Sequence, residues 1–259
     1  MFMSEVIKVS GLIKYYHKVN VLKGIDLSIQ SGELIGYIGP NGAGKSTTIK
    51  VLCGLIPDFA GEVQVLGMDV AKNALDIKRK IGYIPENAAL YETLTPLEYL
   101  LFIGQLYQLP EASVKQKANE LLKLFDLDKA KENRMTTFSK GMKQKVLLIS
   151  GMLHNPEIIF LDEPLSGLDA NAVILVKEIL TQLKQGGKTI FYSSHIMDVV
   201  EKLSDRIIII NQGQIIANGS FQQLNEQAQG GTLEKIFTQL TGQGEQVTVA
   251  NNFVDILKS

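Results

Sequence analysis

The fold of this chain is decided by one segment, Gly39-Pro40-Asn41-Gly42-Ala43-Gly44-Lys45-Ser46-Thr47. It matches the pattern G-x-x-x-x-G-K-[ST], whose glycine-rich loop turns successive backbone N–H groups toward phosphate oxygens. In this pattern the Lys45 ammonium reaches the outer phosphates of a nucleotide, and the Ser46 hydroxyl is a ligand for Mg²⁺. The alternative is a glycine-rich turn between a strand and a helix that binds no ligand.

The residues on either side supply the context that a phosphate-binding loop requires. Residues 34–38 are short, apolar and aromatic, which predicts a buried strand before the loop. Residues 46–52 predict a helix that ends at Gly54, and the N-terminus of such a helix favours a bound anion. This order of strand, loop and helix favours the phosphate-binding interpretation.

Length and composition limit the possible classes of protein. The chain has 259 residues, of which 45% are hydrophobic and 20% are charged, enough for one large α/β domain or a domain with a subdomain. The formal net charge of −1 gives no field that would draw the whole chain to nucleic acid. Cys53 is the single cysteine, so no disulfide within the chain is possible, and we expect it to fill the core.

The sequence contains no candidate membrane span. Its apolar runs are of the length of buried strands, far below the length of a transmembrane helix. Residues 1–5 lack the charged region and the apolar region of a signal peptide. We therefore expect any role at a membrane to depend on a partner chain.

Three segments predict an antiparallel sheet beside the phosphate loop. Residues 6–12, 19–29 and 62–66 interleave polar and apolar side chains in the manner of strands. Tyr16 falls on the connection between the first two segments, where an aromatic ring could stack on a nucleobase. A tyrosine packed on the surface explains the spacing of Tyr16 equally well.

The pattern becomes helical from residue 95 to residue 153. Thr95 and Pro96 are expected to open one helix of this stretch. Ser113, with Gln116 as its capping-box partner, is expected to open another. The stretch therefore predicts a helical subdomain inserted into the α/β core.

Charged side chains follow the two apolar strands expected after this insertion, at residues 157–161 and 189–193. Asp162 is placed to hold Mg²⁺, and Glu163 could polarise a water for attack on a γ-phosphate. His195 could donate a hydrogen bond to that phosphate or to the water. The alternatives are a pair of capping or solvated acids and a structural histidine.

A second anion site is predicted at residues 138–144. Ser139 and the Gly141 N–H stand at the expected N-terminus of a helix, where anions are favoured. Because the chain has one phosphate loop, we expect this second contact to serve the nucleotide of another copy. Asp169 is expected to cap a further helix.

From about residue 6 to about residue 219, the sequence resembles an ATP-binding cassette (ABC) transporter subunit, with motifs in the order typical of that family. Residues 39–47 match the Walker A motif. Residues 139–144 resemble the signature motif, residues 158–163 resemble Walker B with its following glutamate, and residues 166–169 resemble the D-loop. His195 falls at the position of the switch histidine. Tyr16 falls at the position of the aromatic residue that stacks on adenine.

The resemblance implies an α/β fold. Its parts are a P-loop NTPase (RecA-like) core, an N-terminal antiparallel β subdomain and an inserted α-helical subdomain at about residues 87–153. It also implies an ATP-binding domain over residues 1–220 and a C-terminal extension over residues 221–259.

The same resemblance implies an ATPase that uses ATP and Mg²⁺, while the net charge of −1 leads us to expect no nucleic-acid partner. Two cassettes, expected to be identical chains, pair head to tail with each ATP between the phosphate loop of one and the signature of the other. Catalysis is assigned to Glu163 as general base, with His195 and Lys45. The nucleotide contacts are assigned to Tyr16, Gly39, Pro40, Asn41, Gly42, Ala43, Gly44, Lys45, Ser46, Thr47, Ser139, Gly141 and Asp169, and the Mg²⁺ contacts to Ser46, Glu86 and Asp162.

Two positions depart from the family pattern. Glu86 stands where glutamine is common; a carboxylate can bind Mg²⁺, but it adds negative charge near the phosphates. Lys140 replaces a glycine of the signature, and its side chain is expected to hinder a close approach to the backbone at that position. The positive charge of Lys140 could nevertheless help to bind phosphate.

The signature, the Pro85-Glu86 pair and residues 232–242 look like the drug, antibiotic and lipid exporter branch, which uses a separate integral membrane permease of the ABC-2 type. The chain would then act at the cytoplasmic face of the cell membrane as a peripheral subunit. The alternatives within the class are an importer subunit and a soluble ABC ATPase that acts without a permease. A GTPase or kinase is disfavoured because the sequence contains no Asn-Lys-x-Asp motif for guanine.

Overall fold

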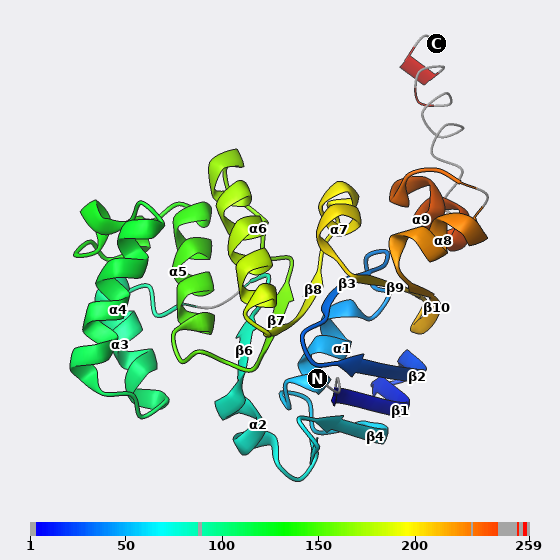
Figure 1. Ribbon diagram of the computed structural model, residues 1–259, viewed down its shortest axis with the longest axis horizontal. Helices are drawn as coiled ribbons and strands as arrows, with labels where there is room; N and C mark the ends of the chain where they lie inside the picture. The colour runs from blue at the N-terminus through cyan, green and yellow to red at the C-terminus, as the bar shows by residue number, and fades with distance from the viewer. Residues whose placement is uncertain (1–3, 88–89, 229, 243–252, 254–255, 258–259) are drawn as a thin grey trace.

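Two β-sheets carry the part of the chain that the computed structural model describes, namely residues 4–87, 90–228, 230–242, 253 and 256–257 (Figure 1). The larger sheet has the strand order β10-β9-β3-β8-β7-β6, and the smaller one has the order β2-β1-β4-β5. The expectations for residues 1–3, for residues 88–89 at the start of the helical insertion and for most residues beyond 242 lie outside this part.

The strands are β1 (Glu5–Tyr16), β2 (Val19–Gln30), β3 (Leu34–Ile38), β4 (Ala60–Val65), β5 (Met68–Asp69), β6 (Ile81–Ile84), β7 (Ile158–Asp162), β8 (Thr189–Ser193), β9 (Arg206–Asn211) and β10 (Gln214–Gly219). The helices are α1 (Lys45–Leu52), α2 (Ala74–Lys80), α3 (Pro96–Leu106), α4 (Glu111–Leu124), α5 (Lys140–Met152), α6 (Ala170–Gln185), α7 (Met197–Leu203), α8 (Phe221–Gln227) and α9 (Leu233–Thr241).

The larger sheet brings distant segments to one edge. Its strands β6, β7, β8, β3 and β9 are parallel, and β10 returns antiparallel to β9. All residues of β3, β7 and β8 are buried, which confirms the prediction of apolar strands covered on both faces. In such sheets ligands bind beyond the carboxyl ends of the strands, and the phosphate loop, Asp162 and His195 stand at or just after those ends.

Alternation along the central strand β3 separates two hydrophobic cores. Leu34 and Ile38 join a cluster with the helical insertion and the C-terminal helices. Ile35 and Tyr37 join a second cluster with the smaller sheet and α1. This period of two is the one expected for a strand between two packed layers.

The smaller sheet confirms the three predicted antiparallel strands and adds the two-residue strand β5. The predicted position of Tyr16 on a turn is wrong. Tyr16 is the last residue of β1 and pairs with Val19, so the turn consists of His17, at φ +53°, and Lys18. Tyr16 is therefore held by a strand ladder.

The helices α3, α4 and α5 lie side by side at one end of the molecule, which confirms a helical insertion (Figure 1). Thr95 caps α3 as predicted, with Glu98 completing a capping box. The predicted start of a helix at Ser113 is wrong, because α4 begins at Glu111 after Pro110. Proline fixes its own φ and cannot donate a backbone hydrogen bond, so it suits a helix start and sets this one two residues earlier.

The C-terminal helices α8 and α9 pack against the body of the chain. Leu224, Leu233, Ile236 and Phe237 are buried within the same cluster as the helical insertion. The backbone N–H of Leu233 donates to Glu201 Oε2 of α7 at 2.9 Å. Residues 221–241 therefore contribute apolar side chains to the core.

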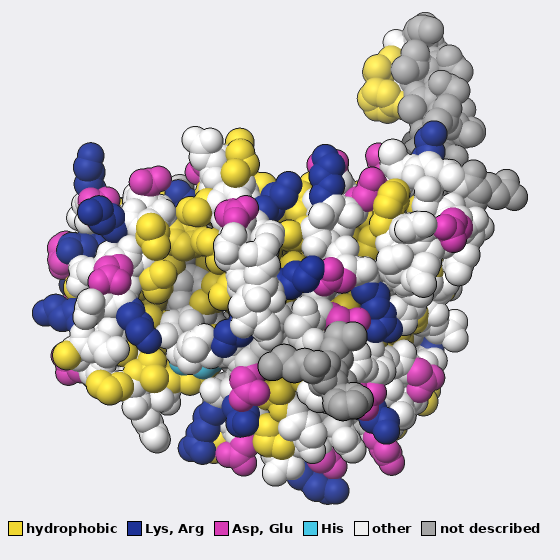
Figure 2. Space-filling model, in the orientation of Figure 1, with side chains coloured by type: hydrophobic (Ala, Val, Ile, Leu, Met, Phe, Trp, Pro, Cys, Tyr) yellow, Lys and Arg dark blue, Asp and Glu magenta, His cyan; other side chains and the backbone are white. Residues whose placement is uncertain are grey.

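Among the described residues, no helix has both the length and the apolar character needed to cross a bilayer. On the face drawn in Figure 2, lysine and arginine side chains are intermixed with aspartate and glutamate. This distribution agrees with the formal net charge of −1.

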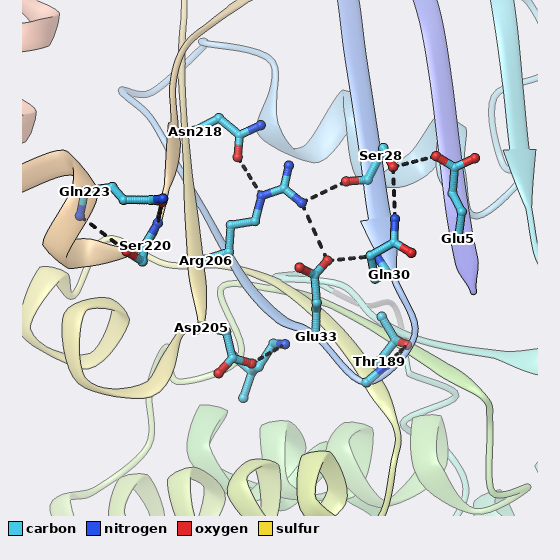
Figure 3. A network of polar contacts seen from close by, with 12 residues as sticks. Glu5, Ser28, Gln30, Glu33, Thr189, Asp205, Arg206, Asn218, Ser220 and Gln223 are labelled. Carbon is cyan, nitrogen blue, oxygen red and sulfur yellow. Dashed lines mark hydrogen bonds and ion pairs between the residues drawn. The ribbon is translucent and has the colours of Figure 1, made fainter. Parts of the chain in front are cut away.

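A polar network joins the two sheets where β2 ends and β9 begins (Figure 3). Arg206 Nε donates to Asn218 Oδ1 at 2.7 Å, and its Nη1 donates to the Ser28 carbonyl oxygen at 2.9 Å. The same Nη1 lies 3.5 Å from Glu33 Oε2, an oxygen that also accepts from the Gln30 N–H. Arg206 thus connects β2 of the small sheet with β9 and β10 of the large one.

We expect Arg206→Met to lower the free energy of unfolding by about 1–3 kcal/mol, because it removes the donor of the Ser28 carbonyl oxygen and the cation beside the Glu33 carboxylate. Urea denaturation measures this. Lys72→Met is the control, since the Lys72–Asp69 pair has side chains 79% and 40% exposed and should contribute less than about 1 kcal/mol. Equally small decreases in the free energy of unfolding for both variants would show that the Arg206 network does not stabilise the packing of the two sheets.

Candidate active site

A cavity of about 530 Å³ lies where the carboxyl ends of β3, β7 and β8 meet the end of β1. Among the described residues its lining consists of Tyr16, Val21, Asn41, Gly42, Gly44, Lys45, Ser46, Thr47, Glu86, Asp162, Glu163 and His195. With the exception of Val21, all of these were assigned to the site from the sequence. The structure therefore brings the predicted aromatic, the phosphate loop, the carboxylates and the histidine into one space.

The phosphate loop is shaped by glycines at two tight positions. Gly44 caps α1 at φ +111°, and a Cβ there would come within 2.6 Å of Leu22 Cδ2. A Cβ on Gly39 would come within 2.3 Å of the Ile210 carbonyl oxygen. Glycine is needed at both positions because the loop must pass this close to β2 and β9.

Lys45 brings a positive charge to the cavity. It is 7% exposed, and its ammonium donates to the Gly39 carbonyl oxygen at 2.8 Å and to the Pro40 carbonyl oxygen at 3.2 Å. Burial lowers the pKa of Lys45, and the nearby carboxylates of Glu163, Asp162 and Glu86 oppose that shift. The ammonium is thus held over the loop, close to where the pattern places the outer phosphates of a nucleotide.

Ser193 links the two acids that follow β7. Its hydroxyl donates to Asp162 Oδ1 at 2.7 Å and accepts from the Glu163 N–H at 3.1 Å. Asp162 is 3% exposed, and Glu163 has φ +51°, an uncommon conformation for a side chain of this kind. The strand end is therefore turned sharply, and that turn carries Glu163 into the cavity.

Glu163 lies against His195. The backbone N–H of His195 donates to Glu163 Oε2 at 3.2 Å. The ring nitrogen Nε2 of His195 lies 3.1 Å from Glu163 Oε1, without hydrogen-bonding geometry. Within the described residues Oε1 is a buried oxygen that accepts no hydrogen bond. Burial raises the pKa of Glu163 to about 7, against the opposing effects of the His195 N–H and Lys45. Burial, followed by the charge of Lys45, lowers the pKa of His195.

The remaining predicted residues lie elsewhere. Gly39, Pro40 and Ala43 belong to the loop but do not line the cavity. Ser139 caps α5 by accepting from the Met142 N–H at 3.2 Å, and Asp169 caps α6 by accepting from the Ala172 N–H at 2.9 Å. Neither residue lines the cavity. The predicted helix starts at these two positions are confirmed.

The signature segment is fastened to the loop after Glu163. A Cβ on Gly141 would come within 2.6 Å of the Gly167 carbonyl oxygen, so the two backbones pass closely. Lys140 does not block this approach, because its side chain extends over Gly167 and donates to Ser166 Oγ at 2.9 Å. Gln144 Nε2 donates to the Pro164 carbonyl oxygen at 3.1 Å.

Sequence reasoning missed two contributors to the site. Val21 is an ordinary apolar residue of β2, and nothing in its sequence context distinguishes it. Ser193 was recognised as a strand residue, but its bonds to Asp162 and Glu163 were not. A hydroxyl at the end of an otherwise apolar strand, directly beside the acid-bearing one, is the feature that could have indicated them.

Comparison with known proteins identifies this constellation. The family model described as "ABC transporter" matches residues 22–166, more than half of the chain. The chain belongs to the ABC transporter family. This ABC cassette is 39% identical over 228 residues to the linearmycin resistance ATP-binding protein LnrL of Bacillus subtilis (strain 168), an alignment that covers 88% of this chain and 73% of LnrL.

Solved structures agree with the ABC cassette fold. The structure of an ATP-binding subunit of an ABC transporter matches with a TM-score of 0.85 and 34% identity, and covers 91% of this chain and 99% of that one. A dimeric ATP-binding cassette in a post-hydrolysis state with ADP and phosphate matches with a TM-score of 0.78 and 26% identity, over 83% of this chain and 98% of that one. The predicted P-loop NTPase core, antiparallel subdomain and helical insertion are thereby confirmed.

The activity follows from the family and the site together. This ABC cassette binds ATP and is an ATPase, as the sequence predicted. ATP-binding subunits of ABC transporters work with membrane permease partners, and the described part of this chain has no membrane-spanning helix of its own.

Proposed function

We propose that two copies of this cassette pair head to tail, close around two ATP molecules and power export through a separate ABC-2 type permease. The observation that carries the proposal is the division of the predicted nucleotide contacts. Lys45, Glu163 and His195 share one cavity, whereas Ser139 and Gly141 do not line it. A second copy supplies the missing signature contacts if each signature faces the cavity of the other chain.

Glu163 is the general base of the proposed reaction. Its Oε1 accepts no hydrogen bond from the residues that the structure describes, and its pKa of about 7 suits proton transfer at neutral pH. The carboxylate accepts the proton of the attacking water as that water bonds to the γ-phosphorus and the bond to the β–γ bridging oxygen breaks. Lys45 then stabilises the charge on the phosphate oxygens. The backbone N–H of His195 orients the Glu163 carboxylate.

Mg²⁺ is the metal that the site fits. Among the described residues there is no cluster of three or more His, Cys, Asp or Glu side chains that would form a metal cage. Mg²⁺ is commonly bound by one or two protein oxygens together with water and substrate phosphates, and the lining residues Ser46, Asp162 and Glu86 offer a hydroxyl and two carboxylates. Bound there, the ion would supply positive charge to the β- and γ-phosphates.

The remaining nucleotide contacts are assigned by the same proposal. We assign Tyr16 to stacking on the adenine ring. Its side chain is 42% exposed and borders the cavity, which supports this assignment. The loop residues Gly39 to Thr47 surround the phosphates with backbone N–H groups. Asp169 belongs to the segment that faces the second copy. We assign residues 1–220 to the ATP-binding domain, about 87–153 to its helical subdomain and 221–259 to the C-terminal extension.

Export rather than import is supported by similarity. LnrL is named as a linearmycin resistance ATP-binding protein, and resistance of this kind is consistent with removal of the compound. An export partner of the ABC-2 type places the cassette as a peripheral subunit on the cytoplasmic face of the membrane. The substrate would be recognised by that permease.

Expression of the cassette with and without a candidate ABC-2 type permease tests the proposal. We expect the cassette to sediment with membranes when that protein is present and to remain in the supernatant when it is absent. Membrane-independent ATPase activity with no association in either case would contradict the assignment to a permease.

A further inference from the structure

Lys14 is a buried cation that the proposed mechanism does not use. Its side chain is 5% exposed and lies near the end of β1. The ammonium donates to the backbone carbonyl oxygen of Asp58 and to its Oδ2, the latter at 3.0 Å, while the Asp58 side chain is 93% exposed. Burying a charge is costly, and a carboxylate this well solvated offsets the cost only in part. Packing alone would be served by an apolar side chain of the same length.

The Asp58 contact ties two parts of the site together. Asp58 lies in the connection between α1, which starts in the phosphate loop, and β4. Lys14 lies on the strand that ends at Tyr16. The hydrogen bonds of Lys14 therefore join the strand with the aromatic ring to the segment that follows the helix of the phosphate loop.

The ammonium of Lys14 also lies under the Tyr16 ring. The pairing of β1 with β2 shifts register between Lys14 and Tyr15, so regular alternation is interrupted there and the contact between the two side chains is a local feature of the strand end. Lys14 Nζ is 5.1 Å from the centroid of the Tyr16 ring, within the range of a cation–π interaction. The ring is partly exposed and borders the cavity, so one aromatic side chain contacts both the cation and the nucleotide space.

We infer that Lys14 is a positioning residue for nucleotide binding: it holds the Tyr16 ring in the orientation that receives a base, and through Asp58 it fixes that ring relative to the phosphate loop. The inference rests on the proposed stacking role of Tyr16. A ring that is already oriented loses less conformational freedom when the base arrives, so the base binds more tightly. Lys14 thereby affects the contribution of the base to the binding free energy of the nucleotide and leaves the contribution of the phosphates unchanged.

Binding of Mg·ADP and of Mg·pyrophosphate, measured by calorimetry, separates these two contributions. We expect Lys14→Met to weaken ADP binding by about five- to tenfold and to change pyrophosphate binding by less than about twofold. Lys14→Arg, which keeps a cation for the ring and donors for Asp58, should restore most of the ADP affinity. Lys8→Met is the matched control, because Lys8 is an exposed lysine of the same strand and should change neither affinity.

Combination with Tyr16→Ala tests whether Lys14 acts through the ring. Tyr16→Ala alone should weaken ADP binding, and Lys14→Met should add no further loss in that background. If Lys14→Met fails to fold, Lys14→Gln, which removes the charge and retains a hydrogen-bond donor, takes its place.

Three outcomes would overturn the inference. Equal weakening of ADP and pyrophosphate by Lys14→Met would show a general loosening of the cavity. An unchanged ADP affinity in Lys14→Met, with a loss in Tyr16→Ala, would show that the ring needs no support from Lys14. No loss in Tyr16→Ala itself would remove the stacking role from the proposed function, and the inference would fall with it.

Discussion

Glu163→Gln slows ATP hydrolysis by about 10²- to 10⁴-fold and leaves ATP binding unchanged within about threefold, if Glu163 is the general base. The amide has nearly the shape of the carboxylate, and its oxygen can still accept from the His195 N–H that now bonds Oε2 at 3.2 Å. It cannot take up the proton of the attacking water. Single-turnover hydrolysis and equilibrium ATP binding, measured on the same preparation, check the two parts of this result.

A matched control separates loss of the base from loss of a carboxylate. Glu178→Gln alters an exposed glutamate on α6 whose partner is Gln182, and its turnover should equal that of the wild type. Hydrolysis by Glu163→Gln at more than a tenth of the wild-type rate would assign the base elsewhere.

Lys45→Ala should weaken ATP binding by about 10- to 100-fold, because hydrogen bonds to charged groups contribute about 1.5–3 kcal/mol. The Lys45 ammonium is 7% exposed and lies among carboxylates, so the alanine variant leaves the cavity with a net negative charge that repels a triphosphate. Isothermal titration with Mg·ATP measures the change.

The control for this variant lies on the same helix. Lys50 belongs to the last turn of α1 and is exposed, so Lys50→Ala removes a positive charge from α1 away from the cavity lining. We expect its ATP affinity to match the wild type. Similar affinities for Lys45→Ala and the wild type would show that Lys45 acts only to hold the Gly39 and Pro40 carbonyl groups.

The parts of the site that the sequence predicted are those that depend on short, fixed spacings. The loop from Gly39 to Thr47 carries its glycines, lysine and hydroxyl groups in one short continuous segment, so the sequence pattern alone predicts its conformation. Asp162 and Glu163 were predicted because an apolar run ends directly before them, and buried parallel strands end at the ligand edge. Ser139 was predicted as a helix cap for the same local reason.

The contacts that the sequence did not predict join residues far apart in the chain. Lys14 and Asp58 are separated by 44 positions, and their contact depends on the register of β1 and on the path taken after α1. Ser193 reaches Asp162 over 31 positions, and only the pairing of β7 with β8 sets them opposite each other. The short helices α2 and α7 were missed because seven residues are too few to display a helical period.

If each ATP site is completed by the signature of a second copy, a negative charge at Ser139 should prevent the two copies from pairing around ATP. Ser139→Asp keeps a side chain that caps α5 but places a negative charge where the partner's γ-phosphate would lie. The measurement is the molar mass of Glu163→Gln with Mg·ATP, alone and combined with Ser139→Asp, by analytical ultracentrifugation. We expect a dimer for the single variant and a monomer for the double variant, with ATP bound in both. A Glu163→Gln chain that binds ATP and remains a monomer, with its permease present as well as absent, would show that the ATP site does not need a second copy.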